Sequence, residues 1–417
     1  MKILVVGKGG REHALIQTLK ASPTSPDIYC FPGSDAIFNL AQPTSATDLP
    51  SLIEWMIANE IDLCVAGEES YLVTGEGLAN LCADNNIPCW GPNRHAAQLE
   101  ASKNFAKEFL FRHAIPTGSS QLVHSYDQAL DAIDGNYPTV LKFDGLAAGK
   151  GVAVCPDAES AQEFLSEVFE EKRFGEGSLL VEEFLTGKEV SIFAAVSGPD
   201  AFIFTPARDY KLIGEGDTGP NTGGMGAVAG RQILDKELME TIEETIINPT
   251  IRGMEKDEFG YKGFLYFGLM LTENGPKVIE YNCRFGDPEC QAVMPLVSGD
   301  FAQFCLGGAQ GKLDSSLLNF SEAWSVCVIL ASHGYPESSR SGDVISGLDQ
   351  LSDSAQLFHA GTKLNAEQNW ETNGGRVLAV VSQGDSREEA VEKAHAEADK
   401  VSFDGAQRRR DIGIINF

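Results

Sequence analysis

A glycine-rich segment between two apolar runs constrains this chain more than any other feature. Residues 144–152 read Asp-Gly-Leu-Ala-Ala-Gly-Lys-Gly-Val, after a run that ends at Phe143 and before an apolar run over 152–155. A strand, a glycine turn and a second strand predict a flap over nucleotide phosphates. The glycines let backbone N–H groups approach anionic oxygens, and Lys142 and Lys150 add positive charge. Because a strand follows, and because Gly-x-x-x-x-Gly-Lys-[Ser/Thr] is missing from the sequence, the segment is not a P-loop. A mobile glycine loop without a ligand is the alternative.

Length and charge limit the possible classes of protein. A chain of 417 residues with 43% hydrophobic residues predicts two or three globular units. The net charge of −28 argues against nucleic acid as a partner. Anionic substrates would then need lysines, arginines and backbone amides gathered locally. The one dense basic run, 408–410, is expected to be a solvated tail, with contact to a substrate phosphate as the alternative.

Cysteine usage and hydropathy bear on the compartment. The nine cysteines are scattered and none forms Cys-x-x-Cys, which argues against a disulfide scaffold or a zinc site and favours a reducing cytoplasm. The chain enters a strand at residue 2 without a signal-peptide layout, and it contains no 18-residue apolar run. We expect a cytoplasmic protein without a membrane partner, and a monomer is the working expectation.

The first hundred residues alternate between strand and helix patterns. This alternation predicts a doubly wound parallel sheet whose sites lie at the carboxyl ends of its strands. The predicted strands are 2–6, 28–31 and 61–66, the helices are 12–20, 48–59 and 78–85, and the turns after the strands are 7–12, 32–34 and 67–70.

The remaining chain mixes α and β patterns. Ser102 is a candidate N-cap for a helix over 103–112, and Asn274-Gly275 marks the turn of a hairpin. We predict an α/β and α+β multidomain protein: an N-terminal Rossmann-like domain over 1–100, a flap-bearing domain over 101–323 with a small subdomain at about 118–187, and a small β-rich α+β domain over 324–417. Further predicted elements are helices 158–171, 234–256 and 386–401 and strands 263–271, 277–282, 325–332 and 377–382.

Polar residues alternate along the second strand of that hairpin. Glu280, Asn282 and Arg284 share one face if the strand continues, because side chains alternate with a period of two. Carboxylate and amide oxygens suit Mg²⁺, which takes its remaining ligands from water and phosphates, and an arginine can neutralise phosphoryl oxygens. The sequence therefore predicts a metal site at Glu280 and Asn282. A solvated edge strand is the alternative.

Two further segments are weaker signals. Residues 217–226, Asp-Thr-Gly-Pro-Asn-Thr-Gly-Gly-Met-Gly, cannot build a core helix or strand and predict a tight loop that offers amides to a small anion such as a carboxylate. A structural omega loop is equally compatible. Residues 181–185, Val-Glu-Glu-Phe-Leu, with Glu189, could present backbone groups to adenine and a carboxylate to ribose.

The turn over 7–12 resembles a dinucleotide motif but has Gly-x-Gly-Gly spacing, so it predicts a phosphate or ribose-phosphate site at a helix N-terminus rather than a nicotinamide site. Nucleophilic catalysis finds no support, since Gly-x-Ser-x-Gly is missing from the sequence.

Taken in order, these motifs resemble the ATP-grasp superfamily and, within it, the phosphoribosylamine–glycine ligase family. The most specific segments are 144–152, 217–226, 280–289, and 359–363 with 373–376. The resemblance implies an ATP-dependent carboxylate–amine ligase of purine biosynthesis. It would join glycine to 5-phosphoribosylamine through glycyl phosphate, with ATP as substrate and Mg²⁺ (or Mn²⁺) as the metal. The chain length leaves no room for fused later enzymes, so one activity is expected.

The resemblance also implies roles for particular residues. Glu280 and Asn282 would bind the metal, while Arg284, Lys142 and Asp217 would be catalytic. ATP would be bound by Lys103, Lys142, Gly145, Gly149, Lys150, Gly151, Glu182, Glu183, Leu185 and Glu189. Glycine and the ribosylamine would be bound by Gly9, Gly10, Arg11, Glu12, Gly67, Glu69, Asp217, Asn221, Thr222, Gly223, Gly224, Met225, Arg284, Asp287 and Arg376.

Four positions depart from the family pattern: Lys8 stands for a common Asn, Glu68 for Pro, Ala101 for Gly and Tyr210 for His. The first two lie at the expected ribosylamine end. Two other hypotheses therefore remain: an ATP-grasp ligase with a different acceptor, such as a biotin-carboxylase-like or amino-acid ligase, and a nucleotide-binding sensor that has lost catalysis. The sensor predicts damage at Lys142, Glu280, Asn282 or Arg284, yet all four are present.

Overall fold

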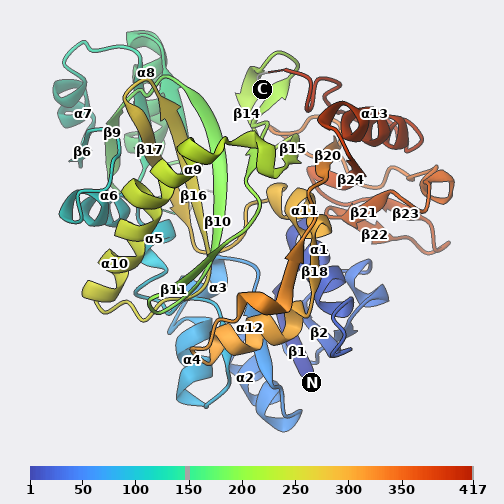
Figure 1. Cartoon of the computed structure of the whole chain (residues 1–417). Helices are drawn as coiled ribbons and strands as arrows, with labels where there is room; N and C mark the ends of the chain where they lie inside the picture. Colours follow the sequence, from blue (N-terminus) through green and yellow to red (C-terminus); the bar gives the residue numbers. More distant parts are fainter. Residues whose placement is uncertain (146–150, 416–417) are drawn as a thin grey trace.

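Five parallel strands begin the chain and form its first sheet (Figure 1). In this computed structural model, which describes residues 1–145 and 151–415, β1 lies between β2 and β4. Alternate residues of β1 belong to different apolar clusters, so helices cover both faces and the doubly wound prediction is confirmed. The elements are β1 (Lys2–Gly7), α1 (Gly10–Lys20), β2 (Asp27–Pro32), β3 (Gln42–Pro43), α2 (Leu49–Ala58), β4 (Leu63–Ala66), α3 (Ser70–Val73), α4 (Leu78–Asp84) and β5 (Cys89–Trp90).

The order of these strands, β3-β2-β1-β4-β5, reverses direction between β1 and β4. Turns that follow strands on either side of such a reversal form a crevice in which ligands bind. Here the two turns are those after Gly7 and Ala66. They are the two turns that the sequence singles out.

A short connection leads to α5 (Gln98–Ala101) and α6 (Lys103–Arg112). The Ser102 hydroxyl accepts a hydrogen bond from the Phe105 N–H at 3.1 Å, so Ser102 caps α6 as predicted. The cap fixes where the helix begins, and therefore it places Lys103 on the first turn.

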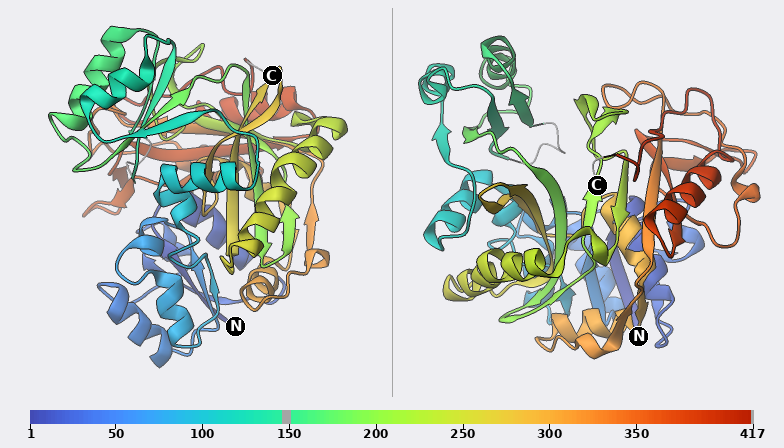
Figure 2. Two further views of the ribbon diagram at one scale, coloured as in Figure 1. Left: turned by 90° about the vertical axis from the view of Figure 1, so that its left-hand side faces the viewer. Right: turned by 45° about the horizontal axis from the view of Figure 1, so that its top comes forward.

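A small antiparallel sheet then stands away from the first one (Figure 2, right). It has its own apolar core, which includes Leu141, Phe143 and Leu165. Strands β7 and β8 pair with Lys142 opposite Val152, as a flap requires. The turn between them, 146–150, lies outside the described residues. The elements are β6 (Ser120–Val123), α7 (Tyr126–Ile133), β7 (Thr139–Phe143), β8 (Val152–Cys155), α8 (Ala158–Phe169) and β9 (Leu179–Glu183).

The largest sheet has nine strands and joins the middle of the chain to its end. Its order is β17-β16-β10-β12-β15-β20-β24-β21, with β11 paired to β10. The proposed boundary at residue 323 thus falls where one continuous sheet passes from β15 to β20, and the division into domains stays a prediction. The strands are β10 (Lys188–Ser197), β11 (Asp200–Ile203), β12 (Ala207–Asp209), β15 (Gly226–Ala229), β16 (Lys262–Thr272), β17 (Gly275–Asn282), β20 (Trp324–Ala331), β21 (Gln356–His359) and β24 (Arg376–Gly384).

Helices pack on this sheet and on its connections. The predicted helix 234–256 is divided into α9 (Lys236–Ile242), a π-helical turn (Glu243–Ile247) and α10 (Asn248–Lys256). The other elements are β13 (Leu212–Gly214), β14 (Thr218–Asn221), α11 (Glu289–Val293), β18 (Val297–Gly299), α12 (Phe301–Ala309), β19 (Leu318–Phe320), β22 (Thr362–Leu364), β23 (Trp370–Thr372) and α13 (Arg387–Ala398), with 3₁₀ turns at Ile37–Asn39, Arg231–Ile233, Met294–Leu296, Ser315–Leu317 and Leu348–Gln350.

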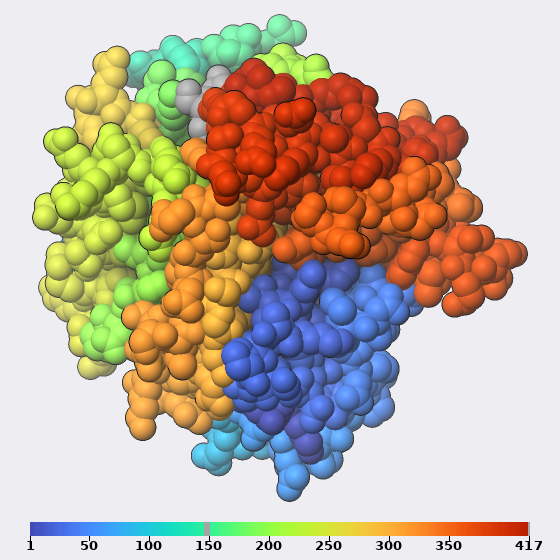
Figure 3. Space-filling view, turned by 45° about the vertical axis from the view of Figure 1, so that its right-hand side comes forward, coloured from blue at the N-terminus to red at the C-terminus, as the bar shows by residue number. Residues whose placement is uncertain are grey.

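The C-terminal region lies against the first sheet's helix α1, and the two are side by side in Figure 3. The His359 N–H donates to Nδ1 of His13 at 2.9 Å. Burial lowers the pKa of His13 to about 4 and that of His359 to about 3, so both imidazoles are neutral at pH 7. The contact therefore joins α1 of the first sheet to the C-terminal region through two uncharged side chains.

The basic run 408–410 is not a solvated tail, and that expectation was wrong, although the Arg410 side chain itself is 64% exposed. The Arg409 side chain is 1% exposed and forms ion pairs with Asp217 at 2.8 Å and Asp411 at 2.7 Å. Its guanidinium also lies 5.1 Å from the centre of the Tyr210 ring. Arg408 and Arg410 both pair with Asp399. Asp411 and Asp399 lie near the run in sequence, but Asp217 lies 192 positions before Arg409, and composition alone does not indicate that contact.

Candidate active site

Two lysines and one glutamate form a buried cluster where α6 meets β7 and β9 of the small sheet. Lys142 on β7 and Lys107 on α6 lie 3.0 and 3.1 Å from the Glu182 carboxylate, and all three side chains are at most 7% exposed. Lys142 also donates to the Ile279 carbonyl at 3.1 Å. The second Glu182 oxygen, Oε1, is buried without a hydrogen-bond partner. An unsatisfied buried carboxylate oxygen is costly, so it marks a place where a donor on a ligand would be favourable.

The base of the flap is attached to the first turn of α6. Lys103 donates to the Gly145 carbonyl at 2.9 Å, and Asp144 accepts from the Ser102 hydroxyl at 3.1 Å and from the Asn104 N–H at 3.2 Å. The Gly151 carbonyl accepts from the Phe143 N–H at 2.7 Å. Burial lowers the pKa of Lys103, and the nearby Glu280 carboxylate partly offsets that effect. The predicted Gly149 and Lys150 lie outside the described residues.

The predicted adenine and ribose residues lie at the end of β9, in its connection to β10, and at the start of β10. Glu183 accepts from the Ser119 N–H at 3.0 Å and lies 3.5 Å from Lys277. Glu189 pairs with Lys211 at 2.8 Å. Leu185 lies in the connection between β9 and β10, close to Gly118. These residues therefore line the connection between the small sheet and the large one.

The predicted metal residues lie at the end of β17. Glu280 pairs in register with Gly268 of β16, and Asn282 pairs with Tyr266. The surroundings of Asn282 assign its amide nitrogen to the side of the acceptors, where it donates to the Tyr281 carbonyl at 3.0 Å and to Glu100 at 3.2 Å. This orientation leaves the amide oxygen as the available ligand atom. A carboxylate and an amide oxygen are hard donors, so this pair fits a hard divalent cation.

Arg284, just beyond β17, is held by two acidic side chains. Its guanidinium lies 2.8 Å from Glu100 and 3.1 Å from Glu69. Burial raises the pKa of Glu100 to about 7, although Arg284 opposes that effect. By contrast, the pKa of Glu69 falls to about 2 against the cost of burial, because Arg284 and Arg11 favour its charged form. Two partners fix the direction of the arginine, which a phosphoryl-binding group requires.

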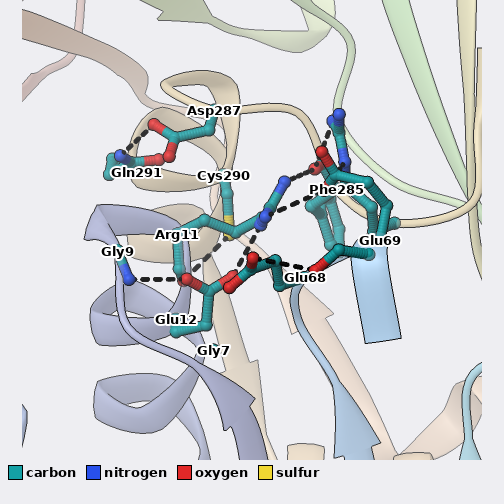
Figure 4. A network of polar contacts seen from close by, with 12 residues as sticks. Gly7, Gly9, Arg11, Glu12, Glu68, Glu69, Phe285, Asp287, Cys290 and Gln291 are labelled. Carbon is teal, nitrogen blue, oxygen red and sulfur yellow. Dashed lines mark hydrogen bonds and ion pairs between the residues drawn. The ribbon is translucent and has the colours of Figure 1, made fainter. Parts of the chain in front are cut away.

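The turn after β1 forms a closed network with the same arginine region (Figure 4). Arg11 donates to Glu12 at 2.7 Å and to the Phe285 carbonyl at 3.2 Å, and it lies 3.4 Å from Glu69. Glu12 also accepts from the Gly9 N–H at 2.7 Å. A Cβ at Gly67 would overlap the Glu12 side chain. Glu12 is thus buried among protein partners, whereas Arg11 points toward the 284–287 segment.

The C-terminal region completes this end of the site through Arg376. Its guanidinium donates to the Gly223 carbonyl at 2.6 Å and to the Asp287 carbonyl at 2.7 Å, and it lies 3.2 Å from the Asp287 carboxylate. Asp287 in turn accepts from Gln291 at 2.7 Å. A Cβ at Gly10 would come within 2.6 Å of the Gln291 amide, so this glycine permits α1 to approach α11. Arg376 therefore joins the 217–226 segment to the end of β17.

The 217–226 segment differs from the predicted open loop. Residues Thr218–Asn221 form β14, an exposed hairpin strand paired with β13. The backbone amides of the following residues are already bonded: Thr222 to the Lys211 carbonyl, Gly223 to the Tyr335 hydroxyl, Gly224 to the Thr222 hydroxyl and Met225 to the Tyr210 carbonyl. In this conformation these four amides are engaged within the protein, so the predicted role of the segment in binding an anion stays a prediction.

Asp217 lies in the turn of the hairpin, between β13 and β14, with a positive φ of 54°. Its carboxylate pairs with the buried Arg409 at 2.8 Å. Tyr210 accepts from the Gly413 N–H at 3.0 Å and donates to the Ile415 carbonyl at 3.2 Å. The hairpin is thus bound to the end of the chain.

Four residues at the site were missed from the sequence: Glu100, Lys107, Gln291 and Tyr335. Lys107 could have been found, because it lies one helical turn after Lys103 and so shares its face. Glu100 contacts Arg284 across 184 positions of sequence, and Tyr335 contacts Gly223 across 112 positions. No local pattern indicates such contacts.

Models of three consecutive family domains match this chain. They are described as the N domain, the ATP-grasp (A) domain and the C domain of phosphoribosylglycinamide synthetase, and they match residues 1–100, 101–290 and 325–414. The chain belongs to this family. It is similar to phosphoribosylamine–glycine ligases of Caldanaerobacter subterraneus, at 42% identity, and Yersinia pestis, at 41% identity. Each alignment covers 99% of this chain, with 99% and 98% of the respective relatives.

Solved structures agree with this assignment. A phosphoribosylamine–glycine ligase from Thermotoga maritima superposes with a TM-score of 0.85 at 31% identity, over 99% of this chain and all of that one. A biotin carboxylase from Campylobacter jejuni superposes with a TM-score of 0.73 at 16% identity, over 97% and 92% of the two chains. The second likeness shows the ATP-grasp fold alone. Within residues 1–145 and 151–415, no helix has the length and apolar character needed to cross a bilayer.

Proposed function

We propose that this protein joins glycine to 5-phosphoribosylamine, coupled to the cleavage of ATP to ADP and phosphate. The product is glycinamide ribonucleotide, a step of purine synthesis. The observation that carries the proposal is the position of Arg284. It follows the metal-type residues Glu280 and Asn282, and through Glu69 it is linked to Arg11 in the turn after β1. Arg284 thus lies between the proposed ATP site and a second site that is suited to an anion.

In the first half-reaction, a glycine carboxylate oxygen attacks the γ-phosphorus of ATP and ADP leaves. Phosphoryl transfer depends on positioning and on neutralised charge more than on covalent help. Lys103 and Lys142 would hold the phosphates together with the flap, and Arg284 would neutralise charge on the transferred group. Glu182 now pairs with Lys142 and would release that lysine toward ATP. Alternatively, its Oε1 atom, which has no hydrogen-bond partner, would accept a hydrogen bond from the adenine.

Glu280 and Asn282 would hold a divalent metal, and we propose Mg²⁺, with Mn²⁺ as a substitute. When bound, such an ion would neutralise negative charge on the phosphate groups. The oxygen donors of this pair fit that ion, because the amide nitrogen of Asn282 is already engaged by Glu100. Glu100 would therefore orient both Asn282 and Arg284.

In the second half-reaction, the ribosylamine nitrogen attacks the carbonyl carbon of glycyl phosphate, phosphate leaves, and the amine loses a proton. The turn with Gly9, Gly10 and Arg11 would hold the ribose phosphate with Gly67 and Glu69, because a helix N-terminus favours an anion. Asp287 and Arg376 would border the same substrate. An acyl phosphate hydrolyses readily, so a small sheet with its own core would serve as a lid that excludes water.

The remaining predicted residues keep proposed roles. Glu183, Leu185 and Glu189 would contact the nucleoside, and residues 221–225 would border the glycine after their internal hydrogen bonds rearrange. Asp217 pairs with Arg409, so we propose that it positions the hairpin and does not touch the reacting atoms. All nine cysteines are free, which supports a reducing cytoplasm. A monomer stays the working proposal.

The test is ADP release by the purified protein with Mg·ATP, leaving out glycine and ribosylamine in turn. We expect release that requires both, with glycinamide ribonucleotide identified by mass. Hydroxylamine in place of the ribosylamine should trap glycyl phosphate as a hydroxamate.

A different amine acceptor is the second candidate, because Lys8 and Glu68 depart from the family at the ribosylamine end. Hydroxamate formation from glycine without turnover on ribosylamine would favour it. Failure of glycine to support either reaction, while ATP still binds, would contradict both proposals.

A further inference from the structure

Three cysteines that are scattered in the sequence meet in the N-terminal domain. They are Cys64 on β4, Cys82 on α4 and Cys89 on β5. Their sulfur atoms all lie within 4.8 Å of one another. The absence of Cys-x-x-Cys argued against a thiolate site, but that reasoning considers only ligands that are close in sequence. The fold brings these three cysteines together although their spacing in the sequence does not indicate it.

The geometry of the sheet explains the meeting. Strands β4 and β5 are parallel neighbours, and Cys64 lies directly opposite Cys89 in their register. Paired residues point to the same face of a sheet, so both sulfurs project from one face. Helix α4 covers that face through Leu78, Ala79 and Cys82, which share an apolar cluster with the two strand cysteines. Cys64 and Cys82 are fully buried, and Cys89 is 8% exposed.

We propose that Cys64, Cys82 and Cys89 form a binding site for a soft, thiophilic ion that accepts three sulfur ligands. Soft ions favour thiolate sulfur over oxygen. Thiolate–metal bonds of about 2.3 Å place sulfurs roughly 4 Å apart, so the cluster would need only a small contraction to enclose an ion. The site is distinct from the proposed ligase site and does not depend on the proposed function.

The number of ligands and the charge narrow the choice of ion. Structural zinc sites almost always have four protein ligands, whereas this group of His, Cys, Asp and Glu ligand atoms among the described residues has three members. Three thiolates would leave a net negative charge on Zn²⁺ inside an apolar cluster, which is unfavourable. Trivalent arsenic avoids both problems, because three As–S bonds complete its coordination and the product is neutral.

The binding step with arsenite balances without an oxidant. Three As–O bonds of As(OH)₃ break and three As–S bonds form. Each departing hydroxide leaves as water with one thiol proton, and the oxidation state of arsenic does not change.

Cys82→Ala and Cys305→Ala provide a matched test, because both cysteines are fully buried and helical but Cys305 lies on α12, outside the cluster. Alanine suits a helix interior at either position. The full chain, kept reduced and free of oxygen, is titrated with arsenite and examined by native mass spectrometry. The ultraviolet absorption of arsenic–sulfur bonds and the fluorescence of Trp90, adjacent to Cys89, give independent readouts.

We expect one arsenic atom per chain, bound with the loss of three hydrogens, in the wild type and in Cys305→Ala. Binding should weaken at least 100-fold in Cys82→Ala, since two sulfurs cannot complete the coordination. Circular dichroism would establish that both variants are folded.

Equal binding by Cys82→Ala, or no binding by the folded wild type, would overturn the proposal. Zn²⁺ that binds as tightly as arsenite would overturn the three-ligand assignment. A Cys64–Cys89 disulfide that forms in air even with arsenite bound would show a redox pair instead.

Discussion

The ATP end and the ribosylamine end of the proposed site differ in how they hold their positive charge. At the ATP end, Lys142 and Lys107 share one carboxylate, Glu182. Lys142 belongs to β7 of the small sheet, whereas Lys107 belongs to α6, which precedes that sheet. At the other end, Arg11 and Arg284 both contact Glu69, and Arg284 also contacts Glu100. Lysines are flexible point charges, whereas arginines held by two partners keep a direction. The first arrangement can rearrange as ATP binds, and the second is already organised.

Arg284→Lys tests the organised end and should have the largest effect. The substitution keeps the charge but loses the fork that contacts both Glu69 and Glu100. We expect kcat/KM to fall roughly 10³-fold, as for other groups that stabilise transition-state charge, while the affinity for ATP changes little. Steady-state kinetics and ATP calorimetry measure the two. A loss below tenfold would mean that Arg284 is structural.

Lys142→Met and Lys107→Met compare two lysines on the same carboxylate. If Lys142 turns to ATP, its loss should lower kcat/KM for ATP about 100-fold. Loss of Lys107, which also bonds Thr117 and Gly118, should cost less than about tenfold. Equal losses would show that the lysines act only through Glu182.

The buried His13–His359 contact helps to hold α1, the helix that also carries Arg11 of the organised end. Burial lowers the pKa of His13 to about 4 from 6.5. A lowered pKa means that the folded state binds fewer protons, so stability is full above pH 6.5 and is lost as the pH falls toward 4. Between pH 7 and about pH 5 His13 should account for about 2 kcal/mol.

In His13→Asn the amide oxygen can replace Nδ1 as the acceptor for the His359 N–H, but it does not titrate. Urea unfolding at both pH values should show that the variant loses about 2 kcal/mol less than the wild type on acidification. An unchanged acid sensitivity would place the titration elsewhere.

Tyr210→Phe should give the smallest effect. It removes the hydroxyl that bonds Gly413 and Ile415 but keeps the ring beside Arg409. One unsatisfied buried N–H predicts a loss of about 1 kcal/mol, with faster amide exchange at Gly413. Stability loss with unchanged exchange there would argue against this contact.

Local features were predictable because their causes are local. Ser102 and the helix that it caps have the predicted bounds, since a cap and an apolar face identify a helix start. The β16–β17 hairpin and the β7–β8 pair also follow from strand patterns on either side of a turn. These elements carry Lys142, Glu280 and Asn282.

The partners of the charged residues could not be predicted in the same way. Arg409 looked like a solvated residue because its partners Asp217 and Tyr210 lie almost 200 positions earlier. The sequence predicted an open 217–226 segment because it does not reveal the acceptors of the segment's amides. Two of these acceptors are the Tyr335 hydroxyl and the Tyr210 carbonyl, which the folded large sheet brings near. The glycine content of residues 217–226 indicated tight turns of the backbone but not which groups its amides would bond.

The contacts of Arg409 have a consequence for how such chains can recombine. Asp217 and Tyr210 belong to the segment that borders the proposed glycine site, whereas Arg409 belongs to the last residues of the chain. A chimera that keeps Tyr210 and Asp217 but takes its C-terminal region from a relative with other residues around position 409 would replace the buried guanidinium that both of them contact. We therefore expect position 210 and the residues around 409 to be inherited together, although a boundary near residue 323 would separate them.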